Sequence, residues 1–440
     1  MTVSTTATIE VDSASGHLCA AGSGKRLDTV LIKTSSRCNI DCSYCYVYRG
    51  QDTKWRGLPK RMRHIVLDAV QHRLIEHAGR QRAGFAIVLH GGEPLLLEFG
   101  RLAAMLRNLR VRLCPERYPI SVQTNGTLLN PRTLDLFAET QTTVSVSIDG
   151  PKEVNDLGRL DHRGRSTFAM TLRGIHRLLD HPACNTLFSG TLSVIQPNVS
   201  PASVYGFLRR LRTPSMDFLL QDGNHDRLPP GKKNFESTEY GQWLIKLIDL
   251  YLADPAPVPV RIIDDTIKLC LGGSSQKEGR GKDAYGILTI ETDGEIRKND
   301  TLRTSFDGAD IFSGRWNVTS TDLASVLSSQ EYIDSADMQI PTCDGCRRCQ
   351  LLDVCGGGMP LYRWSAERSY DNPSVYCHDH AVFIRHVIDR LHGFGLKGFT
   401  EHANDSPNRS FRARPVIDRP VVSWIRSEAD CQSEVQPNVS

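Results

Sequence analysis

The sequence has no long apolar run. No stretch reaches the roughly 18 apolar residues that a membrane-spanning helix requires. The first 20 residues include Glu10 and Asp12 and contain no apolar core of a secretory signal peptide. We therefore expect a cytoplasmic protein without a membrane partner.

An excess of charge of one sign is also missing. The 53 Lys and Arg residues nearly balance the 50 Asp and Glu residues, for a formal net charge of +3, and no basic run is interleaved with aromatic residues. We therefore expect no nucleic acid as a partner. With 440 residues, of which 40% are hydrophobic, the chain is long enough for two globular domains and their tails.

Disulfides are not expected, although the chain contains 13 cysteines. In a reducing compartment, clustered thiols bind metal or perform redox chemistry. Three cysteines lie between residues 38 and 45, and five lie between residues 343 and 377. The remaining cysteines are scattered, and we interpret them mainly as small core residues: Cys19, Cys114, Cys184, Cys270 and Cys431.

The first cysteine group has the spacing CxxxCxxC and consists of Cys38, Cys42 and Cys45. It offers three thiolates and no nearby fourth ligand, which suits an iron–sulfur cluster with one open iron better than a closed structural zinc site. A zinc knuckle and three unrelated thiols are the alternatives. The spacing, with Tyr44 before the last cysteine, resembles the cluster-binding loop of radical SAM enzymes. This resemblance implies a 4Fe–4S cluster whose open iron is chelated by S-adenosyl-L-methionine.

Around this loop, short apolar segments alternate with amphipathic helical segments. Strands are expected at residues 29–33, 85–89, 120–123, 144–148, 187–195 and 216–220. Helices are expected at residues 61–78, 101–113, 131–139, 167–179, 201–211 and 240–252. The alternation predicts an α/β fold with a parallel sheet, and the resemblance implies a partial (β/α)6 TIM-like barrel.

We predict four segments along the chain. They are a flexible lead-in at 1–26, the barrel at 27–254, a cysteine-rich extension with a C-terminal helix at 255–396, and a polar tail at 397–440. The boundary after the barrel is placed at the stiff proline-rich linker that begins at Asp254. Beyond the linker, residues 286–291 and 295–298 flank the turn Thr292-Asp293-Gly294, a pattern that predicts a hairpin.

Ligands of parallel α/β sheets bind at the carboxyl ends of the strands, and polar residues follow several of the predicted strands. Gly91, Gly92 and Glu93 form a turn in which backbone can approach a ligand closely and a carboxylate can accept hydrogen bonds. The resemblance implies that this turn holds the amine of S-adenosylmethionine; a plain strand-to-helix turn is the alternative. Further expected contacts to this ligand, with turn formation or surface charge as alternatives, are Tyr44, Asn125, Ser147, Asp149 and Arg159.

The second cysteine group includes the run Cys346, Cys349 and Cys355, with Cys377 as a distant fourth thiol. Four thiolates can hold a complete cluster, and structural zinc is the alternative. The surrounding region, Ile262 to His380, resembles the SPASM extension of radical SAM peptide and protein maturases.

The SPASM resemblance is incomplete. The usual pattern carries seven cysteines for two auxiliary clusters, whereas Asn299 and Met359 stand at two of those positions here. We therefore expect one auxiliary 4Fe–4S cluster, on Cys346, Cys349, Cys355 and Cys377. Whether Cys343 or Cys270 ligates a cluster stays open.

Two aspartates are candidate catalytic residues. Asp300 stands where sulfatase-maturing relatives have an aspartate that accepts a substrate proton, and an ordinary turn aspartate is the alternative. Asp222 lies in the loop after the sixth predicted strand, where it could face a substrate or simply help to close the barrel.

Three passages, at residues 219–226, 292–302 and 355–377, resemble the cyclophane-forming subgroup of radical SAM/SPASM maturases. The resemblance implies an enzyme that joins an aromatic ring carbon to a β-carbon in a ribosomally made precursor peptide. It also implies an electron donor of the flavodoxin or ferredoxin type. The alternatives are sulfatase-type formylglycine maturation, epimerisation, thioether formation, and a non-catalytic iron–sulfur or zinc scaffold.

Overall fold

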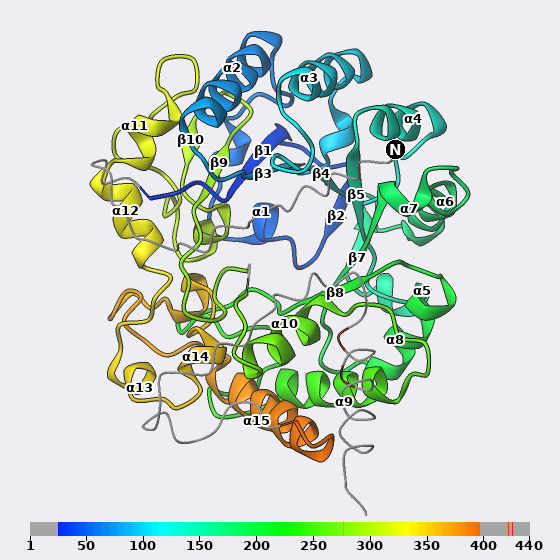
Figure 1. The fold of residues 1–440 in the computed structure, drawn as a ribbon, viewed down its shortest axis with the longest axis vertical. Coiled ribbons are helices and arrows are strands. Elements are labelled where there is room, and N and C mark those ends of the chain that lie inside the picture. The colour runs from blue at the N-terminus through cyan, green and yellow to red at the C-terminus, as the bar shows by residue number, and fades with distance from the viewer. Residues whose placement is uncertain (1–24, 276, 397–420, 422–424, 426–440) are drawn as a thin grey trace, which may run out of the picture.

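Figure 1 shows an eight-stranded sheet that curves into an open barrel, with helices on its outer side. The computed structural model describes residues 25–275, 277–396, 421 and 425. The strand order is β10-β9-β1-β3-β4-β5-β7-β8. Six strands in this order are parallel to their neighbours, which confirms the predicted α/β fold: β1 (Thr29–Ser35), β3 (Ala86–Gly91), β4 (Ile120–Thr124), β5 (Thr142–Ser147), β7 (Phe188–Val194) and β8 (Met216–Leu219).

The predicted helices lie between these strands and pack apolar faces against the sheet. In α4, Pro131 occupies the first turn and the Asn130 side chain accepts a 3.1 Å hydrogen bond from the Thr133 N–H, so the start of the helix is fixed by its own sequence. The buried face of α4 includes Leu134 and Phe137. The helices that match predicted ones are α2 (His64–Arg80), α3 (Phe99–Arg112), α4 (Pro131–Glu139), α6 (Phe168–Leu179), α8 (Pro201–Arg210) and α9 (Glu239–Ala253).

Short elements that the sequence did not predict shape the rim of the barrel. A small antiparallel pair joins β2 (Ile40–Cys42) to β6 (Arg159–Asp161), with Cys42 opposite Arg159. This pairing brings the cysteine loop beside the segment that follows β5. The other short helices before residue 254 are α1 (Tyr46–Arg49), α5 (Lys152–Asn155) and α7 (Cys184–Leu187).

The cysteine-rich extension begins within the same sheet as the barrel. The predicted hairpin is confirmed as β9 (Ile287–Ile290) and β10 (Ile296–Arg297), and Gly294 has the positive φ of 90° that its turn requires. Strand β9 also pairs in parallel with β1, a contact that the sequence did not reveal. The extension's helices are α10 (Arg261–Cys270), α11 (Leu323–Leu327), α12 (Gln330–Asp337), α13 (Asp344–Arg347), α14 (Leu352–Cys355) and α15 (Cys377–Gly393).

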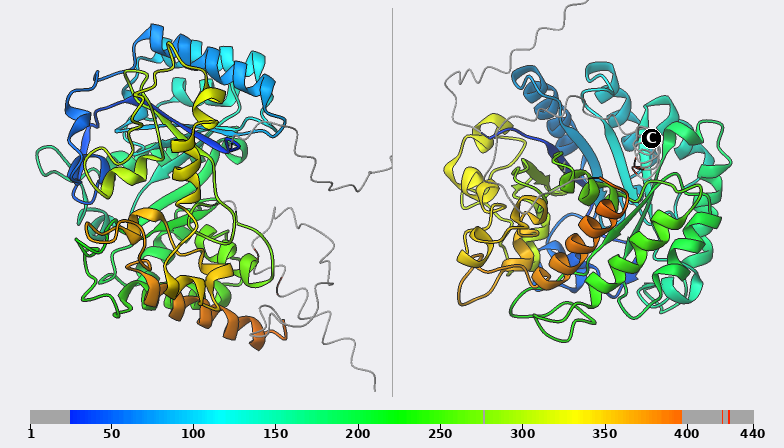
Figure 2. Two further views of the ribbon diagram at one scale, coloured as in Figure 1. Left: turned by 90° about the vertical axis from the view of Figure 1, so that its left-hand side faces the viewer. Right: turned by 60° about the horizontal axis from the view of Figure 1, so that its bottom comes forward.

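The last helix ties the extension back to the barrel. Helix α15 packs along α9, as Figure 2 shows, and His386 Nε2 lies 2.9 Å from Asp249 Oδ1. The sheet and the α9–α15 pair both connect the chain before Asp254 to the chain after it. The predicted domain boundary at this residue therefore stays a prediction.

Most of the predicted lead-in and tail lies outside the described residues. Two positions of the tail are described, however: Val421 and Ile425 are buried within the hydrophobic core. Among the described residues, no helix combines the length and the apolar character that crossing a bilayer demands.

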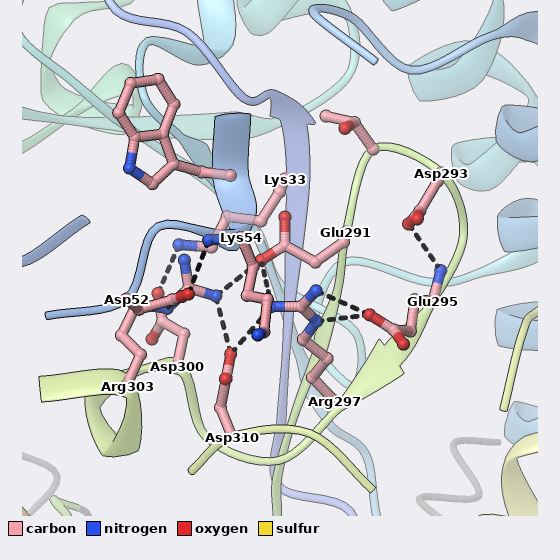
Figure 3. Close-up of polar contacts among 12 residues, drawn as sticks. Lys33, Asp52, Lys54, Glu291, Asp293, Glu295, Arg297, Asp300, Arg303 and Asp310 are labelled. Atoms are coloured by element: carbon pink, nitrogen blue, oxygen red, sulfur yellow. Dashed lines mark hydrogen bonds and ion pairs between the residues drawn. The ribbon is translucent and has the colours of Figure 1, made fainter. Parts of the chain in front are cut away.

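A buried network of charges joins the hairpin to the first strand (Figure 3). The Arg303 guanidinium donates to Glu291 at 2.6 Å and to Asp310 at 2.8 Å. Arg297 donates to Glu295 at 2.7 Å, and Lys33 on β1 forms an ion pair with Asp300. These side chains have little contact with solvent, so each charge depends on its partners for stabilisation.

Replacement of Arg303 should destabilise the fold strongly. In Arg303→Met, the carboxylates of Glu291 and Asp310 lose a partner that is 1% exposed, and breaking a buried pair of this kind costs about 3–5 kcal/mol of the free energy of unfolding. Denaturant titration measures the loss. Arg315 provides the control: its side chain is 66% exposed and pairs with Glu295, so Arg315→Met should change the free energy by about 1 kcal/mol or less. Equal effects of the two substitutions would contradict this account of the network.

Candidate active site

The three cysteines of the first group lie together on the loop that follows β1. All three thiols are free and partly exposed. Burial raises the pKa of Cys38 to about 12, and the nearby thiols of Cys42 and Cys45 add to the rise. Among the described residues, no three His, Cys, Asp or Glu side chains converge on a single metal ion. Three neighbouring cysteines on one loop fit a multi-iron cluster, which would favour their thiolate forms.

The Gly91-Gly92 turn presses against this cysteine loop. The N–H groups of Gly92 and Glu93 donate to the carbonyls of Ser35 and Arg37 at 2.9 and 3.0 Å. A Cβ atom on Gly92 would lie 2.3 Å from the Arg37 carbonyl oxygen, and Gly91 has a φ of +136°. The two glycines therefore allow the backbones of the turn and the loop to pair.

The Glu93 carboxylate is buried and fully engaged within the protein. It accepts hydrogen bonds from Thr124 Oγ1 at 2.7 Å, from the Asn125 N–H at 2.9 Å and from the Leu95 N–H at 3.1 Å. Glu93 thus fixes the end of β4 against the turn after β3. The predicted contact to an ammonium group of S-adenosylmethionine stays a prediction.

Asn125 extends this contact to the cysteine loop. Its Nδ2 donates to Asn39 Oδ1 at 2.8 Å and lies 3.7 Å from Cys38 Sγ. Ser147, which was also predicted at this rim, accepts a 2.8 Å hydrogen bond from Gln123 Nε2. Both side chains come from the carboxyl ends of adjacent strands, as predicted.

Tyr44, Asp149 and Arg159 form one connected group. The Tyr44 hydroxyl donates to Asp149 Oδ2 at 2.5 Å and accepts from Arg159 Nη1 at 3.0 Å. Burial raises the pKa of the neighbouring Cys42 to about 11, and the Arg159 charge opposes that rise. The group places a buried positive charge beside the cysteine loop.

Asp300 lies in the barrel interior but is held by other residues. It pairs with Lys33 and accepts a 2.5 Å hydrogen bond from the Tyr46 hydroxyl. Burial alone would raise the pKa of Asp300, but Lys33, His90 and Arg303 outweigh it and hold the pKa well below its usual range. His90 is neutral at neutral pH, because burial and Lys33 lower its pKa to about 4.

Sequence reasoning did not single out Lys33, Tyr46 or His90 as site residues. Tyr46 directly follows the last cysteine of the loop, and His90 directly precedes the glycine turn, so proximity to the motifs was the available signal. Lys33 lies in a predicted strand, and nothing in the sequence distinguishes it from the other residues of that strand.

Two further buried carboxyl groups, Asp222 and Glu278, are influenced by the charge of Asp300. Burial and the charge of Asp300 raise the pKa of Asp222 to about 7. The pKa of Glu278 also rises to about 7, mainly through burial, although Glu278 accepts a hydrogen bond from Asn299 Nδ2. Of the two predicted aspartates, Asp222 therefore changes protonation near neutral pH, whereas Asp300 stays ionised.

The second group brings together five thiols. Burial raises the pKa of Cys346, Cys355 and Cys377, and neighbouring thiols add to the rise: Cys343 acts on Cys346 and Cys377, and Cys349 acts on Cys355 and Cys377. Burial raises the pKa of Cys270, and the charge that acts on this thiol is that of Arg280. The four predicted ligands are thus close together, Cys343 is with them, and Cys270 is apart.

Replacement of Gly92 should disturb the first cysteine group. In Gly92→Ala, the new methyl group would lie 1.9 Å from the Tyr48 hydroxyl and 2.3 Å from the Arg37 carbonyl oxygen. We expect the loop to move and the iron retained after anaerobic reconstitution to fall by about four atoms per chain, the content of one 4Fe–4S cluster. Gly100→Ala is the control, because nothing lies within 4 Å of its new Cβ atom. Unchanged iron in Gly92→Ala would show that this contact does not position the loop.

Comparison with known proteins gives consistent results. The family model described as Radical SAM superfamily matches residues 32–211 of the chain. A cysteine-type anaerobic sulfatase-maturating enzyme of Clostridium perfringens (strain 13 / Type A) is 27% identical over 82% of this chain and 97% of its own length. A serine-type enzyme of Bacteroides thetaiotaomicron is 25% identical over 80% of this chain and 86% of its own length.

A solved structure shares the fold. Native anSMEcpe with bound AdoMet and Cp18Cys peptide superimposes with a TM-score of 0.70 and 22% identity, covering 84% of this chain and 98% of the other. The match includes the partial barrel and extends beyond the superfamily region into the cysteine-rich extension. Residues 32–211 of the chain are thus a radical SAM domain, and the barrel with the cysteine-rich extension after it has the fold of a solved protein that binds AdoMet and a peptide.

Proposed function

We propose that this enzyme modifies a peptide or protein by oxidising one of its residues at the β-carbon. The observation that carries the proposal is the group of three free cysteines on the loop that pairs with the Gly91-Gly92 turn. Similarity to two sulfatase-maturating enzymes over about four fifths of the chain supports a peptide as the substrate.

Cys38, Cys42 and Cys45 would hold the 4Fe–4S cluster, leaving one iron for S-adenosylmethionine. When bound, these cofactors supply the radical that removes a hydrogen atom from the substrate. The chain's own part is to position them and exclude water. The turn at Gly91, Gly92 and Glu93 and the polar side chains around it would bind S-adenosylmethionine: Tyr44, Asn125, Ser147, Asp149 and Arg159.

One auxiliary cluster would complete the cofactor set. The electrostatic interactions that link Cys346, Cys349, Cys355 and Cys377 support a four-thiolate site. At the position of a second cluster, Asn299 caps the helical turn that starts at Asp300 and donates to Glu278. An external donor of the flavodoxin or ferredoxin type would reduce the enzyme.

Loss of the hydrogen atom leaves a substrate radical that must still lose an electron and a proton. Asp222 is our candidate proton acceptor, because it has no hydrogen bond or ion pair with any described residue and its pKa lies near neutrality. Asp300 would act as the fixed charge beside it, since Lys33 and Tyr46 occupy the same carboxylate oxygen.

Two products are compatible with this chemistry. Oxidation of a Ser or Cys to an aldehyde is the first candidate, because the curated relatives are sulfatase-maturating enzymes. An aromatic-carbon to β-carbon crosslink is the second, because Asn299 and Met359 replace cysteines and three passages resemble the cyclophane-forming subgroup. The comparisons favour the first candidate.

The product can be identified from mass and aldehyde reactivity together. The reconstituted enzyme is incubated anaerobically with S-adenosylmethionine, a reductant and either the Cp18Cys peptide or an aromatic-containing precursor encoded beside its gene. We expect a new aldehyde that reacts with hydroxylamine; a crosslink would instead remove two hydrogen atoms and leave no reactive carbonyl. The control is the variant in which Cys38, Cys42 and Cys45 are all Ala, which should cleave no S-adenosylmethionine. Cleavage by this variant would overturn the proposal.

The role of Asp222 predicts a pH dependence. A base works only when it is deprotonated, so product formation should rise with pH through about 7, the pKa of Asp222. Asp222→Asn should remove this rise. Asp300→Asn should move the midpoint to lower pH, because the Asp300 charge helps to raise the pKa of Asp222. The exposed Asp226 in the same loop provides the control, and Asp226→Asn should leave the midpoint in place.

If Asp300 were itself the base, its low pKa would leave the rate independent of pH near neutrality. A flat profile in the unmodified enzyme would therefore reject Asp222 as the proton acceptor.

A further inference from the structure

The second thiol group contains one more cysteine than a cluster needs. A 4Fe–4S cluster takes four thiolates, whereas Cys343 lies with Cys346, Cys349, Cys355 and Cys377. Cys343 is buried, with 4% of its surface exposed, and Cys349 is exposed.

The local backbone explains how Cys343 reaches the group. The Cys343 carbonyl accepts hydrogen bonds from the N–H groups of Cys346 at 3.1 Å and Arg347 at 3.0 Å. The Cys346 carbonyl accepts in turn from the Cys349 N–H at 3.0 Å. Two successive turns therefore carry three cysteines at a spacing of three residues, which brings side chains onto one side of the backbone.

Cys343 and Cys349 stand on either side of Cys346 in this run. Burial raises the pKa of Cys346, and the neighbouring thiol of Cys343 adds to the rise. Both Cys343 and Cys349 act electrostatically on Cys377, which enters from the start of α15. The two outer cysteines thus approach the same partners, one from the protein interior and one from the surface.

We propose that the auxiliary site has three constant ligands, Cys346, Cys355 and Cys377, and that Cys343 and Cys349 can each serve as the fourth. This inference rests on the proposed auxiliary cluster. In the exchange, the iron–sulfur bond to Cys349 breaks as the bond to Cys343 forms, and the proton that leaves Cys343 is taken up by Cys349. The oxidation state of the cluster does not change.

The exchange would have a chemical consequence. Solvent exposure and hydrogen bonding of the ligand sulfurs tune the reduction potential of a cluster, so a buried ligand and an exposed ligand give clusters of different potential. Exposed thiolates are also the ones that oxidants modify first. A buried alternative ligand would keep the cluster in place when Cys349 is oxidised.

Iron content and spectroscopy test the proposal without relying on activity. All variants are made in the background that has Ala at Cys38, Cys42 and Cys45, so that remaining iron belongs to the auxiliary site. After anaerobic reconstitution we expect about four irons per chain, the content of one 4Fe–4S cluster, in this background and in its Cys343→Ala and Cys349→Ala derivatives. The Cys343→Ala/Cys349→Ala double variant should lose this iron, as should Cys346→Ala. Cys270→Ala, which removes a thiol remote from the group, is the matched control and should keep it.

The electron paramagnetic resonance spectra of the reduced single variants should differ from each other, because their fourth ligands differ. Loss of iron in Cys349→Ala alone would show that Cys343 is no ligand, and retention in the double variant would show that neither cysteine is needed; either result overturns the inference. If the background itself binds no iron, the proposed auxiliary cluster fails together with the inference. Cleavage of S-adenosylmethionine by the unmodified enzyme tests the rest of the proposed function separately.

Discussion

The buried ion pair between Lys33 and Asp300 connects the parts of this protein that the chemistry requires. Lys33 lies on β1, directly before the cysteine loop, and Asp300 lies after the hairpin of the extension. Tyr46, which follows the last cysteine of the loop, donates to the same carboxylate oxygen. Because both charges are almost fully buried, neither can be left unpaired without a large loss of stability. The barrel, the loop and the extension therefore hold one another in a fixed relation.

This constraint also separates the functions of the interior carboxylates. Asp300 gains two neighbouring cations that favour its charge at neutral pH: Lys33 and Arg303. Burial and the nearby charge of Asp300 raise the pKa values of Asp222 and Glu278 to about 7, although Arg363 opposes the rise at Glu278. One fixed charge thus separates the pKa values of neighbouring carboxyl groups, as different environments commonly do.

The sequence predicted those parts of the fold that local patterns determine. Apolar strands, amphipathic helices and the Thr292-Asp293-Gly294 turn each follow from a few adjacent residues, and the structure has them close to the predicted bounds. The pairing of β9 with β1 and the Lys33–Asp300 contact, which spans 267 residues, depend on how distant segments meet. No local pattern encodes such contacts.

For the site residues too, local patterns were predictable from the sequence and contacts between distant segments were not. The cysteine loop and the glycine turn were recognisable because close backbone approach restricts which residues fit there. The sequence placed Asn125 and Asp149 at the rim through strand order, but it could not show that Asn125 turns to the cysteine loop or that Asp149 joins Tyr44 and Arg159. Side-chain partners on separate strands are set by packing, and the sequence alone does not specify them.

The cysteine positions that the extension lacks change what its interior can do. A cluster bound there would be held by thiolates; here Asn299 instead caps a helical turn and donates to Glu278, which has a raised pKa. The space near Asp300 therefore contains a hydrogen bond between Asn299 and Glu278 where the usual pattern would have a cysteine. In the proposed function, proton transfer takes place in this interior and electron transfer is left to the five-thiol site. Separating the two paths allows the protein to tune the base through Asp300 and the cluster through the exposure of its fourth ligand.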